Sequence, residues 1–141
     1  MLMQMLAGLA ITIVSILIHV GFISAAISVL HWHGQRSSSA IGLPKVASTL
    51  ALATVWLLGA HTASVWLWSF AFLLLGVFNT LEPAVYFSLI AFTTLGFGDI
   101  TLTEDWRILS GMTAINGLLL FGFSAAFLFE VFTRIHDSGG G

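Results

Sequence analysis

The residues with the clearest chemical potential form one short string, Thr93–Thr94–Leu95–Gly96–Phe97–Gly98–Asp99. It offers two hydroxyl groups, a carboxylate and two glycines that are two positions apart. A lone G-x-G is weak evidence for a nucleotide-binding turn, and the fuller phosphate-loop and dinucleotide patterns are not met. No nucleophile–base pair or metal triad can be assembled from the sequence, so we expect no enzymatic activity and no cofactor. The use of this string therefore depends on the elements that hold it.

The composition of the chain points to lipid as the solvent of those elements. Of 141 residues, 58% are hydrophobic and only 7% are charged, whereas soluble domains carry about 25% charged residues. Asp, Glu, Lys and Arg do not occur before Arg36, between Lys45 and Glu82, or between Arg107 and Glu130. Each gap exceeds the roughly 20 apolar residues that cross a bilayer. The sequence therefore predicts three membrane spans, at Leu2–Leu30, Val46–Phe78 and about Trp106–Ile135.

The segment between the second and third spans is too short to cross a membrane. It begins with Glu82 and Pro83, which are helix-start signals, and it is apolar as far as Thr93. Two glycines follow, so we predict a short re-entrant helix that returns as extended chain. Irregular backbone at membrane depth is tolerated only where it is buried in protein or lines a watery path. The pattern therefore indicates a pore, with the C-terminal end of the helix dipole favouring a cation.

The string Thr93–Asp99 resembles the T-T-V-G-Y-G-D signature of the potassium channel pore-domain family, with Leu95 and Phe97 in place of the usual Val and Tyr. The resemblance covers roughly Glu82 to Ile135, and the first two spans match no motif. The whole chain is similar to small bacterial single-pore-loop ion channels. The resemblance implies an all-α membrane protein with three transmembrane helices, a re-entrant pore helix and a selectivity filter. It further implies a homotetramer in the lipid bilayer that conducts potassium ions, since each chain supplies one filter segment.

The resemblance also implies roles within the filter. Backbone carbonyls that replace the hydration shell of K⁺ would come from Thr94, Leu95, Gly96 and Phe97, with the Thr94 hydroxyl closing the inner site. Gly96 and Gly98 are required because carbonyls can all point one way only if some residues adopt backbone angles closed to other side chains.

Three residues before the filter are expected to support it: Tyr86, Phe87 and Thr93. The side chains of Leu95 and Phe97 would wedge against the pore helices, including Tyr86 and Phe87. Asp99 would stand at the outer mouth, attracting cations or anchoring the filter through Tyr86. In some family members a pore-helix Glu pairs with this aspartate. Ile90 occupies that place here, so the carboxyl pair is absent.

This reading divides the chain into regions. Residues 1–45 form a peripheral first helix and a cytoplasmic connector, 46–137 form the pore domain, and 138–141 are a linker scar. The pore domain comprises an outer helix at 46–78, a pore helix and filter at 82–99, and an inner helix at 106–135.

The charges also predict an orientation. Arg36 and Lys45 place the connector in the cytoplasm by the positive-inside rule. The N-terminus is then outside and the C-terminus cytoplasmic, in a multi-pass protein of the plasma or inner membrane. The first span lacks the basic leader of a signal peptide, and a net charge of −2 indicates no nucleic-acid partner.

The third span holds the cavity and gate candidates: Asn116, Gly117, Gly122 and Glu130. Asn116 is predicted to face the cavity, whereas Gly117 and Gly122 are either gating hinges or packing sites. Glu130 lies four residues before Arg134, in the favourable order for an ion pair, and either gates the inner mouth or stabilises the helix end.

Two features of the first two spans remain open at this level. His61 is either a pH sensor or, as we favour, a neutral histidine hydrogen-bonded to a neighbouring helix. Gly21, Ser24, Ala25 and Ser28 share one helix face, which either receives a neighbouring helix or reflects the ordinary composition of membrane helices. Trp66 and Trp68 are predicted to pack against a neighbouring helix. Two functional rivals also remain, a weakly selective cation channel and a non-conducting scaffold or accessory subunit.

Overall fold

The computed structural model describes residues 1–34 and 43–137. The predicted linker scar at 138–141 and most of the connector lie outside the described residues. Within the described part, all regular structure is helical: α1 (Leu2–Gly34), α2 (Leu43–Leu74), α3 (Leu81–Phe92) and α4 (Arg107–Asp137). The predicted all-α class is confirmed.

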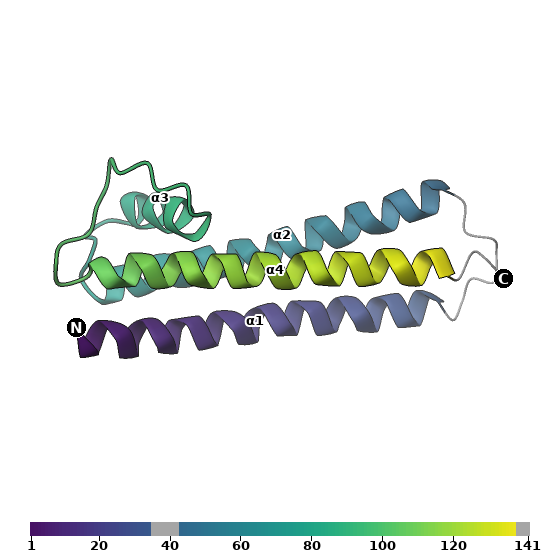
Figure 1. Ribbon diagram of the computed structural model, residues 1–141, viewed down its shortest axis with the longest axis horizontal. Helices are drawn as coiled ribbons and strands as arrows, with labels where there is room; N and C mark the ends of the chain where they lie inside the picture. Colours follow the sequence, from purple (N-terminus) through teal and green to yellow (C-terminus); the bar gives the residue numbers. More distant parts are fainter. Residues whose placement is uncertain (35–42, 138–141) are drawn as a thin grey trace.

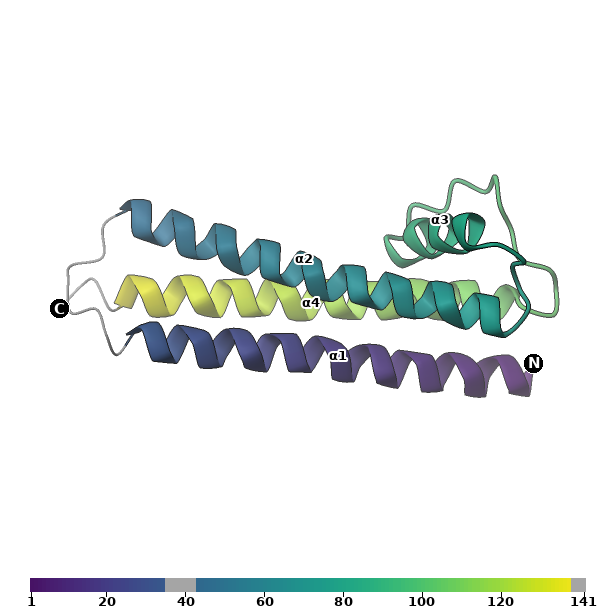
Figure 2. The same ribbon diagram turned by 180° about the vertical axis from the view of Figure 1, so that it is seen from behind.

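Three of these helices are long and apolar enough to cross a membrane. The candidate spans are Leu2–Val29, Val46–Leu74 and Arg107–Ile135, which confirms the three predicted spans. Figures 1 and 2 show them side by side, with α1 and α4 running in one direction and α2 in the other. The N-terminus and the segment after α3 therefore lie at the same end of the bundle.

The predicted end of the second span is wrong by four residues. α2 ends at Leu74 rather than at Phe78, because Gly76 adopts a φ of 69°. A glycine in this left-handed region is a common helix terminator, and the Val77 amide then donates to the Phe72 carbonyl oxygen.

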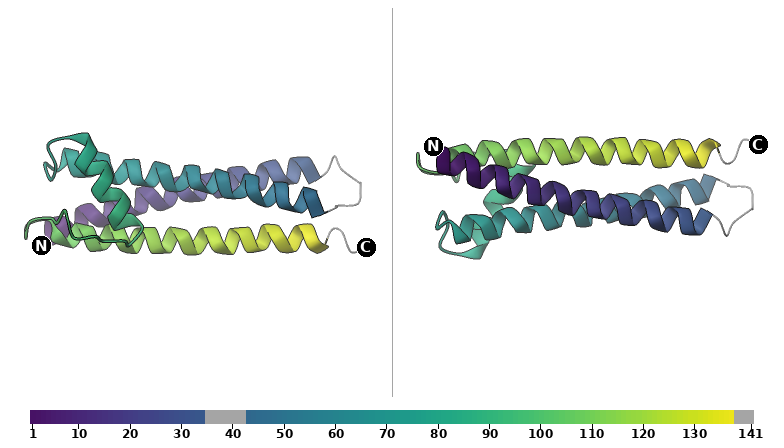
Figure 3. Two further views of the ribbon diagram at one scale, coloured as in Figure 1. Left: turned by 90° about the horizontal axis from the view of Figure 1, so that it is seen from above. Right: turned by 90° about the horizontal axis from the view of Figure 1, so that it is seen from below.

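α1 and α3 lie on opposite sides of the layer that α2 and α4 form (Figures 1 and 3). The first turn of α1 meets the start of α4, where the Gln4 side chain accepts a hydrogen bond from the Ile108 amide at 3.2 Å. This bond satisfies one of the free amides at the start of α4. One turn further on, Gly8 faces Met112 so closely that an added Cβ would lie 2.3 Å from its sulfur.

α1 joins α2 through a hydrogen bond in which the Trp56 indole donates to the Phe22 carbonyl oxygen at 2.8 Å. The two rings also lie 5.2 Å apart. The face formed by Gly21, Ser24, Ala25 and Ser28 receives no neighbouring helix within this chain, because these residues are exposed. The contact surface of α1 is set instead by the residues that face α2 and α4.

The main apolar core lies at the end of the bundle that holds α3. Trp68 and Phe72 of α2 are fully buried there against Phe87 and Phe92 of α3. The prediction for Trp68 is confirmed. The prediction for Trp66 is wrong, because its side chain is 40% exposed and contacts Phe70 of the same helix. The buried aromatic rings thus hold α3 against α2.

Candidate functional site

The candidate site begins at α3 (Leu81–Phe92), which lies within one residue of the helix predicted from Glu82 to Thr93. Glu82 and Pro83 lie in its first turn, and Phe92 is its last residue. Thr93 caps the helix, since its amide and its hydroxyl both bond to the Leu89 carbonyl oxygen, the hydroxyl at 2.7 Å. Thr93 thus supports the point where the helix becomes the string of interest.

The backbone after α3 alternates in handedness. Thr94, Gly96 and Gly98 have positive φ angles of 60°, 53° and 79°, whereas Leu95 and Phe97 between them do not. In an ordinary strand, successive residues face opposite sides, so reversing every second residue allows successive carbonyls to turn to one side. Two of the three reversed positions are glycines, which adopt such angles at little cost.

The string is tied back to α3 at both ends. The Thr94 amide donates to the Ala91 carbonyl oxygen at 3.0 Å, and the Gly96 amide donates to the Ile90 carbonyl oxygen at 3.2 Å. Further along, the Tyr86 hydroxyl donates to Asp99 Oδ2 at 2.6 Å. This bond is the anchor that the sequence suggested for Asp99.

The bond between Tyr86 and Asp99 shapes the charge at this end of the string. The hydroxyl of Tyr86 holds the pKa of the Asp99 carboxyl below its usual range, because a hydrogen bond to the charged form favours that form. The same bond raises the pKa of Tyr86. Asp99 is therefore a carboxylate at neutral pH and places a negative charge beside the string.

The whole string from Thr93 to Asp99 is exposed in the single chain. Leu95 and Phe97 are 61% and 68% exposed, so the expected wedge against Tyr86 and Phe87 does not form within one chain. Phe87 is instead buried in the core with Phe72 and Phe78. A groove of about 550 Å³ remains between the string, α3 and the start of α4.

The end of α3 rests directly on α4. An added Cβ on Gly117 would lie 1.8 Å from the Phe92 carbonyl oxygen, so the backbones meet where no side chain fits. This contact supports the packing explanation of Gly117 over the hinge. Gly122, one turn further on, has no atom within 4 Å of such a Cβ and is exposed.

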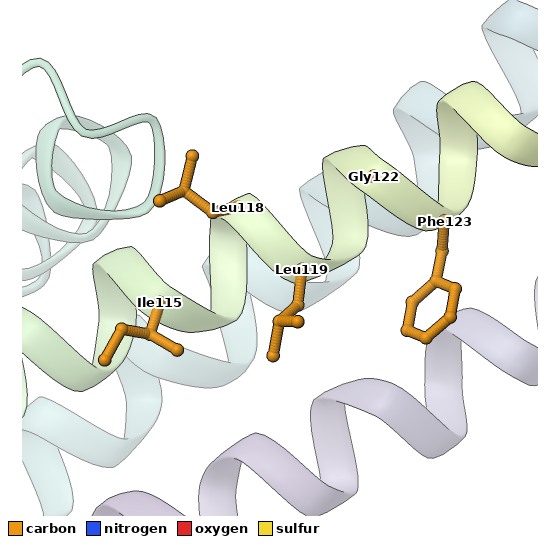
Figure 4. Close-up of a pocket in the computed structure, with 5 residues that line it drawn as sticks. All are labelled: Ile115, Leu118, Leu119, Gly122 and Phe123. Atoms are coloured by element: carbon orange, nitrogen blue, oxygen red, sulfur yellow. The ribbon is translucent and has the colours of Figure 1, made fainter.

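The predicted cavity role of Asn116 is wrong within this chain. Its side chain is fully buried, and neither its nitrogen nor its oxygen has a hydrogen-bond partner within the described residues. It belongs to the face of α4 that Thr113 and Leu120 also bury against the bundle. The exposed face forms a shallow apolar hollow around Gly122, which Figure 4 shows, lined by Ile115, Leu118, Leu119 and Phe123.

Glu130 lies towards the other end of α4. Its carboxylate accepts a hydrogen bond from Arg134 Nε, and both side chains are more than half exposed. The predicted ion pair is confirmed, and it stabilises the last turns of the helix.

The comparison with protein families agrees with this geometry. The sequence profile of a family described as "Ion channel" matches residues 60–134, which include the C-terminal part of α2, α3, the string and most of α4. The chain belongs to this ion channel family. It is thus a multi-pass membrane channel and not an enzyme. No curated protein and no solved structure matches the chain.

Several residues of this channel escaped the sequence reasoning. His19 and Ser124 meet His61 in the interior of the bundle, and Gln4 caps α4. The sequence could have identified His19, because an ionisable residue within a membrane span is a functional candidate by default. The position of Ser124 opposite it was not visible, since 105 residues separate the two.

Proposed function

We propose that four copies of this channel form a potassium-selective pore, with the filter at Thr94, Leu95, Gly96, Phe97 and Gly98. The observation that carries the proposal is the alternating handedness of the backbone at 94, 96 and 98. A run of backbone carbonyls turned to one side offers oxygen ligands that replace the water around K⁺. We assign the K⁺ sites to the carbonyls of Thr94, Leu95, Gly96 and Phe97.

Two further observations support the assignment. The filter directly follows the C-terminal end of α3, where the helix dipole is negative and favours a cation. Asp99 adds a full negative charge at the other end of the filter, beside Tyr86. Cations on the ion path thus meet negative potential above and below the filter.

The proposed tetramer follows from the fact that one chain cannot surround an ion. A single filter strand covers one side of an ion, and a closed ring of four is the simplest arrangement that surrounds it. The exposed side chains of Leu95 and Phe97 then pack against neighbouring copies. The apolar hollow around Gly122 faces the cavity or an adjacent copy.

We also propose an orientation for this assembly. The N-terminus and the filter lie at one end of the bundle, and the positive-inside rule applied to Arg36 and Lys45 makes that end external. The C-terminus is then cytoplasmic, in a plasma or inner membrane.

The test is the reversal potential of purified protein in a planar bilayer with K⁺ on one side and Na⁺ on the other. We expect a potential that strongly favours K⁺ and that Gly96→Ala abolishes. Gly76→Ala is the matched control, because it places the same side chain at a similar positive φ outside the filter. Robust current with a potential near zero would instead make this a weakly selective cation channel, in which Leu95 and Ile90 weaken the discrimination.

A further inference from the structure

Two histidines and a serine from three different spans meet inside the bundle. Ser124 Oγ on α4 lies 3.1 Å from His19 Nε2 on α1 and 3.0 Å from His61 Nε2 on α2. The two imidazole rings are 5.1 Å apart. His19 and Ser124 are buried and His61 is partly buried, so this cluster is a polar site within an apolar bundle.

One hydroxyl between two rings limits the hydrogen bonding of the neutral cluster to two arrangements. Either one ring donates its Nε2–H to Ser124 Oγ while the hydroxyl donates to Nε2 of the other ring, or both rings donate to Ser124 Oγ. Neither Nδ1 atom has a partner within the described residues. In both arrangements at least one Nδ1 carries neither a proton nor a partner, so a proton can add there.

An added proton has a defined effect on these bonds. If it binds Nε2 of the accepting ring, both rings become donors to Ser124 Oγ, and the hydroxyl must turn its hydrogen away. The carbonyl four residues back offers an acceptor, as it does for Ser64 and Ser69 in α2. If the proton binds the free Nδ1 of the donating ring, the bonds persist but the ring becomes cationic.

The surroundings of the cluster carry no formal charge. Phe121 of α4 and Phe92 of α3 face His61, and the two histidines face each other. Glu130 lies six positions beyond Ser124, about 9 Å along the helix, and is paired with Arg134. Glu82 belongs to the opposite end of α3 from Phe92, and Tyr86 lies six positions before Phe92, about 9 Å along the helix. A proton on the cluster would thus be the one positive charge at this depth among the described side chains.

The cluster touches the end of the pore helix. The ring of His61 lies 4.5 Å from that of Phe121 and 6.0 Å from that of Phe92, and these two phenylalanine rings are 5.7 Å apart. Phe92 is the last residue of α3 and immediately precedes Thr93. A positive charge here offsets the negative end of the helix dipole that favours a cation in the pore.

We propose that His19, His61 and Ser124 form a proton-binding site within the membrane that reduces ion conduction when it is protonated. The inference rests on the proposed function, because it adds regulation to the same pore. Two imidazoles and a hydroxyl suit a proton better than a metal ion, since the described residues supply no third histidine or carboxylate at this place. The proton acts on permeation through the dipole end of α3 and through the rings of His61, Phe92 and Phe121.

The first test is the K⁺ current in a planar bilayer as the pH of both solutions falls from 8 to 4, a range wider than that in which an exposed histidine changes charge. We expect the current of the natural protein to fall by at least about threefold and that of the double variant His19→Gln, His61→Gln to stay constant. The matched control is His33→Gln, which lies 14 positions from His19 on the same helix, about 21 Å away. It should respond to pH as the natural protein does.

A constant current in the natural protein, or an unchanged pH response in the double variant, would overturn the proposal while leaving the channel function intact. The second test does not depend on current at all. The ¹⁵N signals of the imidazoles, assigned by correlation with the backbone of the natural protein, are followed in lipid nanodiscs over the same pH range. We expect one of the two rings to gain a proton, and two rings that both stay neutral to pH 4 would refute the site even if no variant folds.

Discussion

The carbonyl oxygen of Phe92 lies against the backbone of Gly117, with room for no side chain between them. The end of α3 therefore packs directly on the middle of α4. This contact positions Thr93 and the proposed filter that follows it. A residue that looks like a hinge in the sequence acts here as a point of close contact.

Gly117→Ala is expected to destabilise the channel. Its Cβ would lie 1.8 Å from the Phe92 carbonyl oxygen, so α3 must shift away from α4, at a cost of about 1–3 kcal/mol in the free energy of unfolding. Unfolding with dodecyl sulfate in mixed micelles measures this cost. Gly122→Ala is the control, since nothing lies within 4 Å of its Cβ. Equal stability of the two variants would contradict the close contact between α3 and α4 at Gly117.

Tyr86→Phe is expected to raise the pKa of Asp99 towards its usual value of about 3.9, because the hydrogen bond that favours the carboxylate is lost. The pKa of this carboxyl is lowered in the folded natural protein, so the stabilisation is present at neutral pH. It is lost as the pH falls through that lowered value. The carboxyl ¹³C signal of Asp99, followed from pH 7 downwards, measures the shift.

The variant Asp99→Ala completes this test. It removes the acceptor of the Tyr86 hydrogen bond, so Tyr86→Phe should add little to its effect on the stability of the proposed filter. Additive effects of the two changes, or the same Asp99 pKa in both proteins, would show that the hydrogen bond does not hold this carboxyl.

Trp56→Phe is expected to loosen α1 from α2. The change keeps a ring against Phe22 but removes the indole that donates to its carbonyl oxygen. Hydrogen bonds between membrane helices contribute about 0.6–2 kcal/mol, and the same unfolding experiment resolves such a loss. Trp66→Phe is the control, because the ring of Trp66 contacts Phe70 of its own helix. A larger loss of stability in Trp66→Phe than in Trp56→Phe would argue against the hydrogen bond from Trp56 to Phe22 as a link between α1 and α2.

Phe97→Ala is expected to weaken the proposed tetramer. Phe97 is 68% exposed in one chain, and packing against a neighbouring copy is what would cover it. We expect the fraction of tetramer, measured by light scattering in detergent, to fall at least about threefold. Leu52→Ala serves as the control, since Leu52 is 71% exposed on α2, far from the filter. An unchanged tetramer fraction for Phe97→Ala would refute the contact.

The sequence predicted what depends on hydrophobic length and local signals. The three spans followed from the gaps between charges, and α3 followed from Glu82, Pro83 and the glycines after Thr93. The end of α2 was missed although Gly76 was visible, because the apolar residues after it masked the terminator.

The sequence could not show which face of each helix is buried in the bundle and which faces outward. Lipid is as apolar as a protein core, so no polar stripe marks the outer side of α4 or α1. Asn116 was therefore assigned to the cavity, although it is buried, and Ser24 was considered for a contact it does not make. The pairing of His19 with Ser124 depends on how α1 crosses the bundle, which no local pattern encodes.

α1 touches α4 at three successive levels, at Gln4 and Ile108, at Gly8 and Met112, and at His19 and Ser124. A tilt of α4 must therefore carry α1 with it or break these contacts. Because the outer side of α1 is apolar and exposed, any such joint movement displaces the surrounding lipid. If α4 tilts and carries α1 with it when the proposed pore opens, the work of opening includes work done on the bilayer, whose thickness and stiffness then enter the energetics of gating.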